Sequence, residues 1–210
     1  MKKKGFTLAE ILIALAIVGS IAAISIPMIH KISPDKDKAI VLKVFKTVNE
    51  INNELINNPT NYRFNDGSTN CRENNGILNC TQAPLDGHNS NATGDTKYPR
   101  LLAEYLNLSD NISVGATTSF TTSDGVDWQL QINKNGNVIE RYDLTINTNN
   151  PQRDNCVYNH TTCKNPRRFT FQIDNNAIIT GSDALTRAYI ENPDDLSSRV
   201  EDLQRAEQLD

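Results

Sequence analysis

The sequence feature that most constrains this chain is an apolar run without a charged residue near the N-terminus. The run covers the 19 residues from Ile11 to Ile29. An α-helix of that length measures about 28 Å, which is enough to cross a hydrocarbon layer of about 30 Å. The sequence therefore predicts a single transmembrane helix at residues 11–29.

The charges at the two ends of this run predict its orientation. Lys2, Lys3 and Lys4 precede the run, whereas the sequence after it is acidic overall. Lysine and arginine are enriched on the cytoplasmic side of membrane spans. We therefore expect a single-pass protein whose N-terminus is cytoplasmic and whose remaining chain lies on the outer side.

Two common kinds of N-terminal segment fit the run incompletely. A secretory signal peptide would explain the lysines, and Ala23-Ile24-Ser25 would suit its cleavage, but its apolar region is usually only about 7–15 residues long. A plain membrane anchor would explain the length and the orientation. Neither explains Glu10, because a carboxylate costs about 2.5–3.5 kcal/mol at the centre of a span and less at its edge.

The segment from Lys2 to Pro27 closely resembles the class III leader of type IV pilins and type II secretion pseudopilins. The shared features are a basic leader, Gly5, Phe6, and a glutamate, Glu10, at the fifth position after the glycine. The resemblance implies that a prepilin peptidase cleaves between Gly5 and Phe6 and then methylates the new amine of Phe6. Beyond the first helix the resemblance is weak.

The resemblance also implies a role for Glu10 in assembly. In the family this glutamate pairs with the N-terminal amine of a neighbouring subunit, which here would belong to Phe6, and the pair fixes the register of the helices. In a low-dielectric layer such a pair discriminates between aligned and misaligned neighbours. The alternative is that Glu10 only reaches the membrane interface.

Gly19 and Pro27 fall where the family tends to have residues that loosen the helix. Pro27 lacks an N–H group, and its ring clashes with the carbonyl of Ala23. The resemblance suggests that residues 19–27 partly unwind in the filament. A static kink at Pro27 is the alternative.

The family resemblance implies a set of partners and a location. The partners are like or related pilin subunits in a filament, the prepilin peptidase, an assembly ATPase with its platform protein, and the bacterial inner membrane. The head would be periplasmic or extracellular. Loss of Lys2, Lys3 and Lys4 with the leader would change the net charge from −4 to −7, which argues against broad nucleic-acid binding because phosphate contacts need Lys and Arg.

An amphipathic segment follows the apolar run after Ser33-Pro34-Asp35. Its apolar residues recur at spacings of three and four, which predicts one buried helix stripe: Ile40, Val41, Val44, Phe45, Val48, Ile51 and Leu55. Asn57-Asn58-Pro59 ends the pattern. If the prolines only kink the chain, residues 6–57 form one helix of about 78 Å.

The remaining chain predicts a small antiparallel sheet. Alternating apolar residues mark strands at 126–132, 138–146 and 169–173, and Asn135-Gly136 predicts a hairpin turn. A short helix opened by Pro99 precedes them, and residues 60–96 are expected to be mostly loop. A long helix packed on this sheet is an α+β, pilin-like fold. The expected organisation is a leader at 1–5, a helix at 6–57, a head at 58–192 and a helical tail at 193–210, capped by Asn192 and lying on the surface.

The four cysteines form two close pairs in polar segments. In an oxidising compartment we favour disulfides Cys71–Cys80 and Cys156–Cys163, although three connectivities are possible. A zinc site built from Cys156, His160 and Cys163 is the competing interpretation. Asp143, Asp154 and Asp174 lie near turns, but they offer too few converging oxygens to assign calcium.

No pattern in the sequence predicts catalysis or a cofactor. His30 and His88 have no apparent serine or cysteine partner, and the common nucleotide, hydrolase and metalloprotease motifs are absent from the sequence. The favoured function is a structural, non-enzymatic subunit of a type II secretion pseudopilus or a type IV pilus-like filament. The alternative is a membrane-anchored periplasmic binding module or enzyme that uses the same leader.

Overall fold

The computed structural model describes residues 35–62, 77–80, 83–84, 91–193 and 199–209, together with Ile11 and Leu15. The predicted transmembrane segment therefore lies outside the described residues apart from Ile11 and Leu15. Gly5, Phe6, Glu10, Gly19 and Pro27 lie outside them as well. Among the helices that are described, none is both long enough and apolar enough to cross a membrane.

Helix α2 (Lys36–Asn57) is the long helix of the head, and its predicted apolar stripe is buried except for Ile40 and Phe45, which are half-buried. The carboxylate of Asp35 caps its first turn by accepting hydrogen bonds from the backbone N–H groups of Asp37, at 3.0 Å, and Lys38, at 3.5 Å. At the other end Asn58 caps the helix and Pro59 follows. Apart from Ile11 and Leu15, only this part of the predicted helix 6–57 lies within the described residues.

Six strands form one mixed, largely antiparallel sheet. They are β1 (Thr117–Thr121), β2 (Asp127–Asn135), β3 (Val138–Asn147), β4 (Asp154–Val157), β5 (Pro166–Asp174) and β6 (Ile179–Gly181). The order is β1-β2-β3-β5-β4, and β6 pairs with β5. Only the β4–β5 pairing is parallel among these strands.

The predicted hairpin and its neighbouring strand are confirmed. β2 and β3 are joined at Asn135-Gly136, where Gly136 has a φ of 62°, which glycine adopts readily. The register places Leu130 opposite Leu144, which is opposite Phe171 on β5. Because alternate residues share a face, this register gathers the apolar side chains on one side of the sheet.

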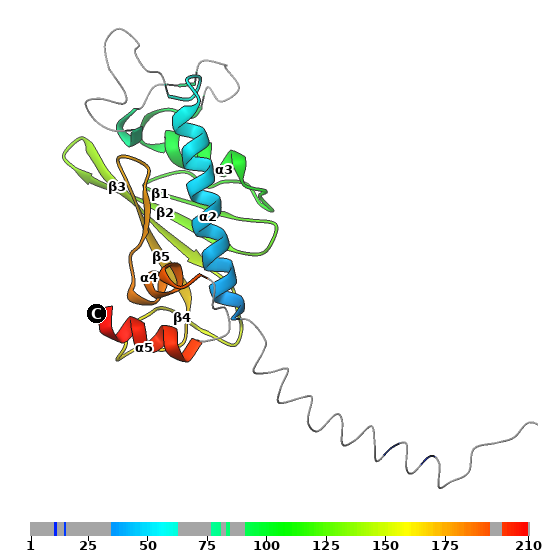
Figure 1. The fold of residues 1–210 in the computed structure, drawn as a ribbon. Helices are drawn as coiled ribbons and strands as arrows, with labels where there is room; N and C mark the ends of the chain where they lie inside the picture. The colour runs from blue at the N-terminus through cyan, green and yellow to red at the C-terminus, as the bar shows by residue number, and fades with distance from the viewer. Residues whose placement is uncertain are drawn as a thin grey trace, which may run out of the picture.

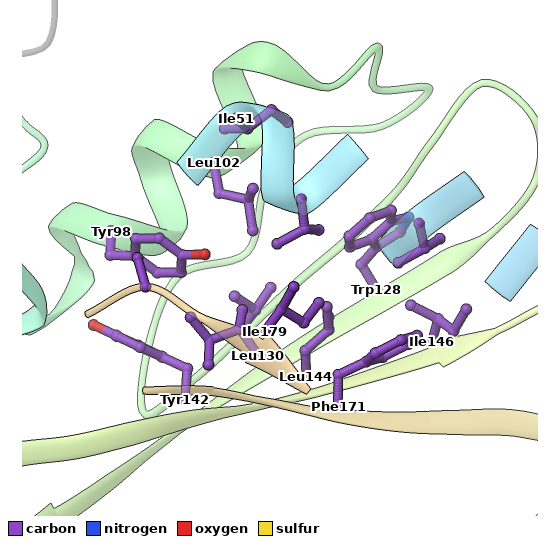
Figure 2. Close-up of a cluster of buried hydrophobic side chains, with 14 of the residues drawn as sticks. Ile51, Tyr98, Leu102, Trp128, Leu130, Tyr142, Leu144, Ile146, Phe171 and Ile179 are labelled. Carbon is purple, nitrogen blue, oxygen red and sulfur yellow. The ribbon is translucent and has the colours of Figure 1, made fainter. Parts of the chain in front are cut away.

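The helices cover that apolar side of the sheet, and α2 runs across it (Figure 1). Figure 2 shows side chains from α2, α3 (Lys97–Tyr105) and the strands pointing toward one another between the two layers. Trp128, Leu130, Leu144 and Phe171 are all buried in this core. Full burial of such side chains contributes roughly 1.5–3 kcal/mol each, so the layer between α2 and the sheet holds the head together.

Two elements near the C-terminus differ from the prediction. Residues Ala184–Glu191 form α4, which the sequence pattern did not reveal, and Asn192 caps its C-terminal end rather than beginning the next helix. The last helix, α5, covers Arg199–Leu209. It is more than a surface helix, because Asp202 and Ala206 are fully buried.

Candidate functional site

A charged cluster surrounds the first turn of α2, and we call this cluster the base of the head. It consists of Asp35, Asp37, Lys38, Arg153, Tyr189, Arg199 and Asp202. In Figure 1, α5 (red) and α4 lie at this end of α2.

Asp35 is the centre of the base of the head. Besides capping α2, its Oδ2 accepts hydrogen bonds from Nη1 of Arg199 at 2.8 Å and from the hydroxyl of Tyr189 at 3.0 Å. Burial alone would raise the pKa of Asp35. The hydrogen bond and charge of Arg199, the Tyr189 hydrogen bond and the charge of Arg153 outweigh burial and hold that pKa below its usual range.

Tyr189 connects α4 to this cluster as a neutral donor. Burial raises the pKa of the Tyr189 hydroxyl well above its usual range. The hydroxyl therefore keeps its proton at neutral pH and donates it to Asp35. It also accepts a hydrogen bond from Nη1 of Arg199 at 2.6 Å.

Asp37 fastens the connection between β3 and β4 to the same turn of α2. Its carboxylate accepts hydrogen bonds from Nε of Arg153 at 3.0 Å, the hydroxyl of Thr148 at 2.7 Å and Nδ2 of Asn150 at 3.0 Å. Arg153 also lies 3.7 Å from Asp35. The cluster thus ties three parts of the chain that are distant in sequence to the helix start.

Lys38 and Asp202 form the most deeply buried ion pair described. Nζ of Lys38 lies 2.8 Å from Oδ2 of Asp202, and both side chains are 0% exposed. Nζ also lies 5.6 Å from the centre of the Tyr189 ring. Removal of one partner of a buried pair leaves an uncompensated charge and typically costs about 3–5 kcal/mol, so this pair holds α5 to α2.

The sequence contained one unused signal for this cluster. Lys38 stands three residues before Val41, in phase with the apolar stripe. A lysine on a buried helix face requires a partner, which predicts a buried ion pair. The identity of that partner could not be predicted, because Asp202 is 164 residues away.

The cysteine predictions have two outcomes. Cys156 and Cys163 form a disulfide with a Cα–Cα distance of 6.4 Å, as predicted. Since both sulfur atoms are in this bond, the competing zinc site with His160 is wrong. Cys71 lies outside the described residues, so the Cys71–Cys80 pairing stays a prediction.

Two of the three aspartates considered as calcium ligands have local hydrogen bonds. Asp143 accepts hydrogen bonds from Asn133 and Arg141, and Asp174 accepts the N–H groups of Asn176 and Ile178 in a turn. Within the described parts of the chain, no cluster of three or more His, Cys, Asp or Glu side chains is arranged to hold a metal ion. His30 and His88 lie outside those parts.

The charged groups of the base of the head are paired with one another. Its carboxylates are engaged by arginine, lysine and hydroxyl groups, and the cluster contains no serine, cysteine or histidine that could act as a nucleophile with its base. Such a network holds the first turn of α2 to α4, to α5 and to the connection between β3 and β4.

Comparison with known proteins identifies the segment that precedes this base. None of the curated proteins and none of the solved structures compared with the chain matches it. Residues 1–26 match the prokaryotic N-terminal methylation motif. The proteins with this motif are structural subunits, processed by prepilin peptidase, rather than enzymes. The chain therefore carries the signature of type IV pilins and pseudopilins at residues 1–26.

Proposed function

We propose that the chain is a structural subunit of a type IV pilus-like filament or a type II secretion pseudopilus. The methylation motif at residues 1–26 is the single observation that carries this proposal. The described head supports it, because a capped amphipathic helix beginning at Lys36 packs on a small antiparallel sheet. That arrangement leaves residues 6–34 to anchor and assemble the subunit.

In the proposed mechanism, prepilin peptidase removes residues 1–5 and methylates Phe6. Residues 11–29 hold the subunit in the inner membrane until an assembly ATPase and its platform protein add it to the filament. Glu10 pairs with the amine of Phe6 on a neighbouring subunit and sets the register, while Gly19 and Pro27 let the helix adapt. The head, braced at its base, is then displayed on the outer side.

Mass spectrometry of the mature N-terminus tests the processing step. We expect a chain that begins with N-methylated Phe6. An intact Met1, or a chain that begins at Ile26 as an ordinary signal peptidase would leave it, would overturn the proposal. Gly5→Leu is the matched variant, and we expect it to accumulate uncleaved.

A Glu10→Ala variant tests the register role separately. We expect cleavage after Gly5 to proceed while incorporation into filaments falls steeply, because the amine of a neighbouring Phe6 loses its counter-charge. Sheared filaments and membranes would be compared by immunoblot. Cleavage together with normal incorporation would mean that Glu10 has no part in the register.

A further inference from the structure

A polar cavity on the outer face of the sheet has no role in the proposed filament function. It has a volume of about 180 Å³ and is lined by residues of four strands, Asp127, Gln129, Thr145, Asn147, Asn155 and Arg168. Trp128, Leu144, Ile146 and Phe169 alternate with these residues and are buried in the core. The cavity therefore opens on the side of the sheet that the helices leave uncovered.

The strand register orders the charges of this cavity. Asp127 on β2 lies opposite Asn147 on β3, and Asn147 lies opposite Arg168 on β5. A carboxylate and a guanidinium group thus stand at the two ends of one row, with an amide between them. Because three paired strands hold this row, the sheet ladder fixes the spacing of the backbone positions that carry the two charges.

Asp127 and Arg168 differ in the hydrogen bonds that they make. Asp127 accepts hydrogen bonds from the hydroxyl of Thr121 and from Nδ2 of Asn149, both at 2.9 Å. Among the described residues, the guanidinium of Arg168 makes no hydrogen bond or ion pair, although its side chain is half-buried. An arginine in such a position offers a planar fork that fits a carboxylate with two hydrogen bonds.

The rest of the lining indicates what the carboxylate should be attached to. The other walls consist of amide and hydroxyl side chains, and no aromatic or aliphatic side chain contributes to them. Such walls match a ligand that carries several hydroxyl groups. The volume is smaller than the roughly 300–1,000 Å³ of drug-sized sites, so it suits one small residue of a larger molecule.

We propose that this cavity binds a carboxylated sugar residue, such as a uronic acid within an acidic polysaccharide. Arg168 takes the carboxylate. Gln129, Thr145 and Asn155 bind hydroxyl groups, and the remaining lone pairs of Asp127 accept from another hydroxyl. The site belongs to the single subunit, so its binding can be measured independently of cleavage and filament assembly.

Titration of the full-length protein in detergent micelles with glucuronate tests the proposal. Ligand-observed NMR should report a Kd on the order of 1 mM for the single sugar. Arg168→Gln should weaken binding by about tenfold or more, because it removes a charge-assisted pair of hydrogen bonds. Arg141→Gln is the matched control: Arg141 is a half-buried arginine on β3 that already pairs with Asp143 at 3.0 Å and lies outside the cavity lining.

Two further probes separate the parts of the ligand. Glucose lacks the carboxylate and propionate lacks the hydroxyl groups, so each should bind about tenfold more weakly than glucuronate. Equal binding of glucose, equal binding of propionate, or unchanged affinity in Arg168→Gln would each overturn the proposal, as would no binding of glucuronate. If Arg168→Gln does not fold, Arg168→Lys keeps the charge without the planar fork and should still weaken binding.

Discussion

Lys38 on the first turn of α2 and Asp202 on α5 form an ion pair of 2.8 Å in which neither side chain is exposed to solvent. The two residues stand near opposite ends of the described chain. Burial of two charges is offset only when both partners are present. The first turn of α2 is therefore stable only when α5 is packed against it.

Replacement of Lys38 by Met should destabilise the head strongly. We expect a loss of about 3–5 kcal/mol in the free energy of unfolding, because the buried Asp202 would lose its 2.8 Å contact with Lys38 and keep the longer one, at 4.0 Å, with Arg205. Trp128 is the single tryptophan and is buried, so its fluorescence during denaturation reports unfolding of the head. The double variant Lys38→Met, Asp202→Leu should recover most of the loss.

Lys43 and Asp124 provide a control on the same helix. Their ion pair is as short, at 2.7 Å, but the side chains are 66% and 41% exposed. Exposed pairs contribute about 0–1 kcal/mol, so Lys43→Met should change stability little. Similar losses in Lys38→Met and Lys43→Met would contradict the importance of burial.

The sequence allows only part of the Lys38–Asp202 pair to be predicted. Local periodicity revealed the buried stripe of α2, and an Asn-Gly turn with alternating strands revealed the hairpin of β2 and β3. Lys38 lies within this apolar stripe, which indicates a buried charge. Its partner is fixed by the tertiary fold, which no local pattern encodes.

The missed elements have weak local patterns. β1 has the sequence TTSFT, with Phe120 as its single large apolar residue, and it is a strand because it pairs with β2. α4 has only eight residues, and Asp183 caps its N-terminus. The sequence Asn192-Pro193 also resembles a helix start, so the sequence pattern predicts that the helix begins there instead. In both cases packing decides the structure over weak propensity.

The base of the head should show a stability contribution that disappears in acid. The pKa of Asp35 is lowered in the folded state, so its ionised form stabilises the fold above the unfolded-state pKa of about 3.9. That contribution is lost as the pH falls through the folded-state value. Asp35→Asn should therefore cost about 1.5–3 kcal/mol at neutral pH and much less under strongly acidic conditions.

Thermal unfolding of wild type and Asp35→Asn across a range of pH measures this effect. Asparagine is also a good N-cap, so the comparison isolates the charge from the helix cap. The difference in Tm should narrow as the pH falls below about 4. A constant difference across the range would show that Asp35 acts only through shape and neutral hydrogen bonds.

The disulfide between Cys156 and Cys163 should stabilise the head modestly. It closes a short loop with a sequence separation of seven residues. Loop-closure entropy for such a loop is worth about 2–3 kcal/mol. The double variant Cys156→Ser, Cys163→Ser should lose that amount in denaturation, and an unchanged midpoint would contradict the expectation. The double variant avoids reductant, which would also break the predicted Cys71–Cys80 bond.

The contact between α5 and the first turn of α2 also sets an order of events during biosynthesis. Asp202 follows Lys38 by 164 residues, so it leaves the ribosome much later than the first turn of α2. Lys38 therefore emerges long before the carboxylate that pairs with it. The base of the head is completed only after α5 has emerged, so a chain terminated before Asp202 would lack the Lys38–Asp202 pair and would be more open to proteolysis.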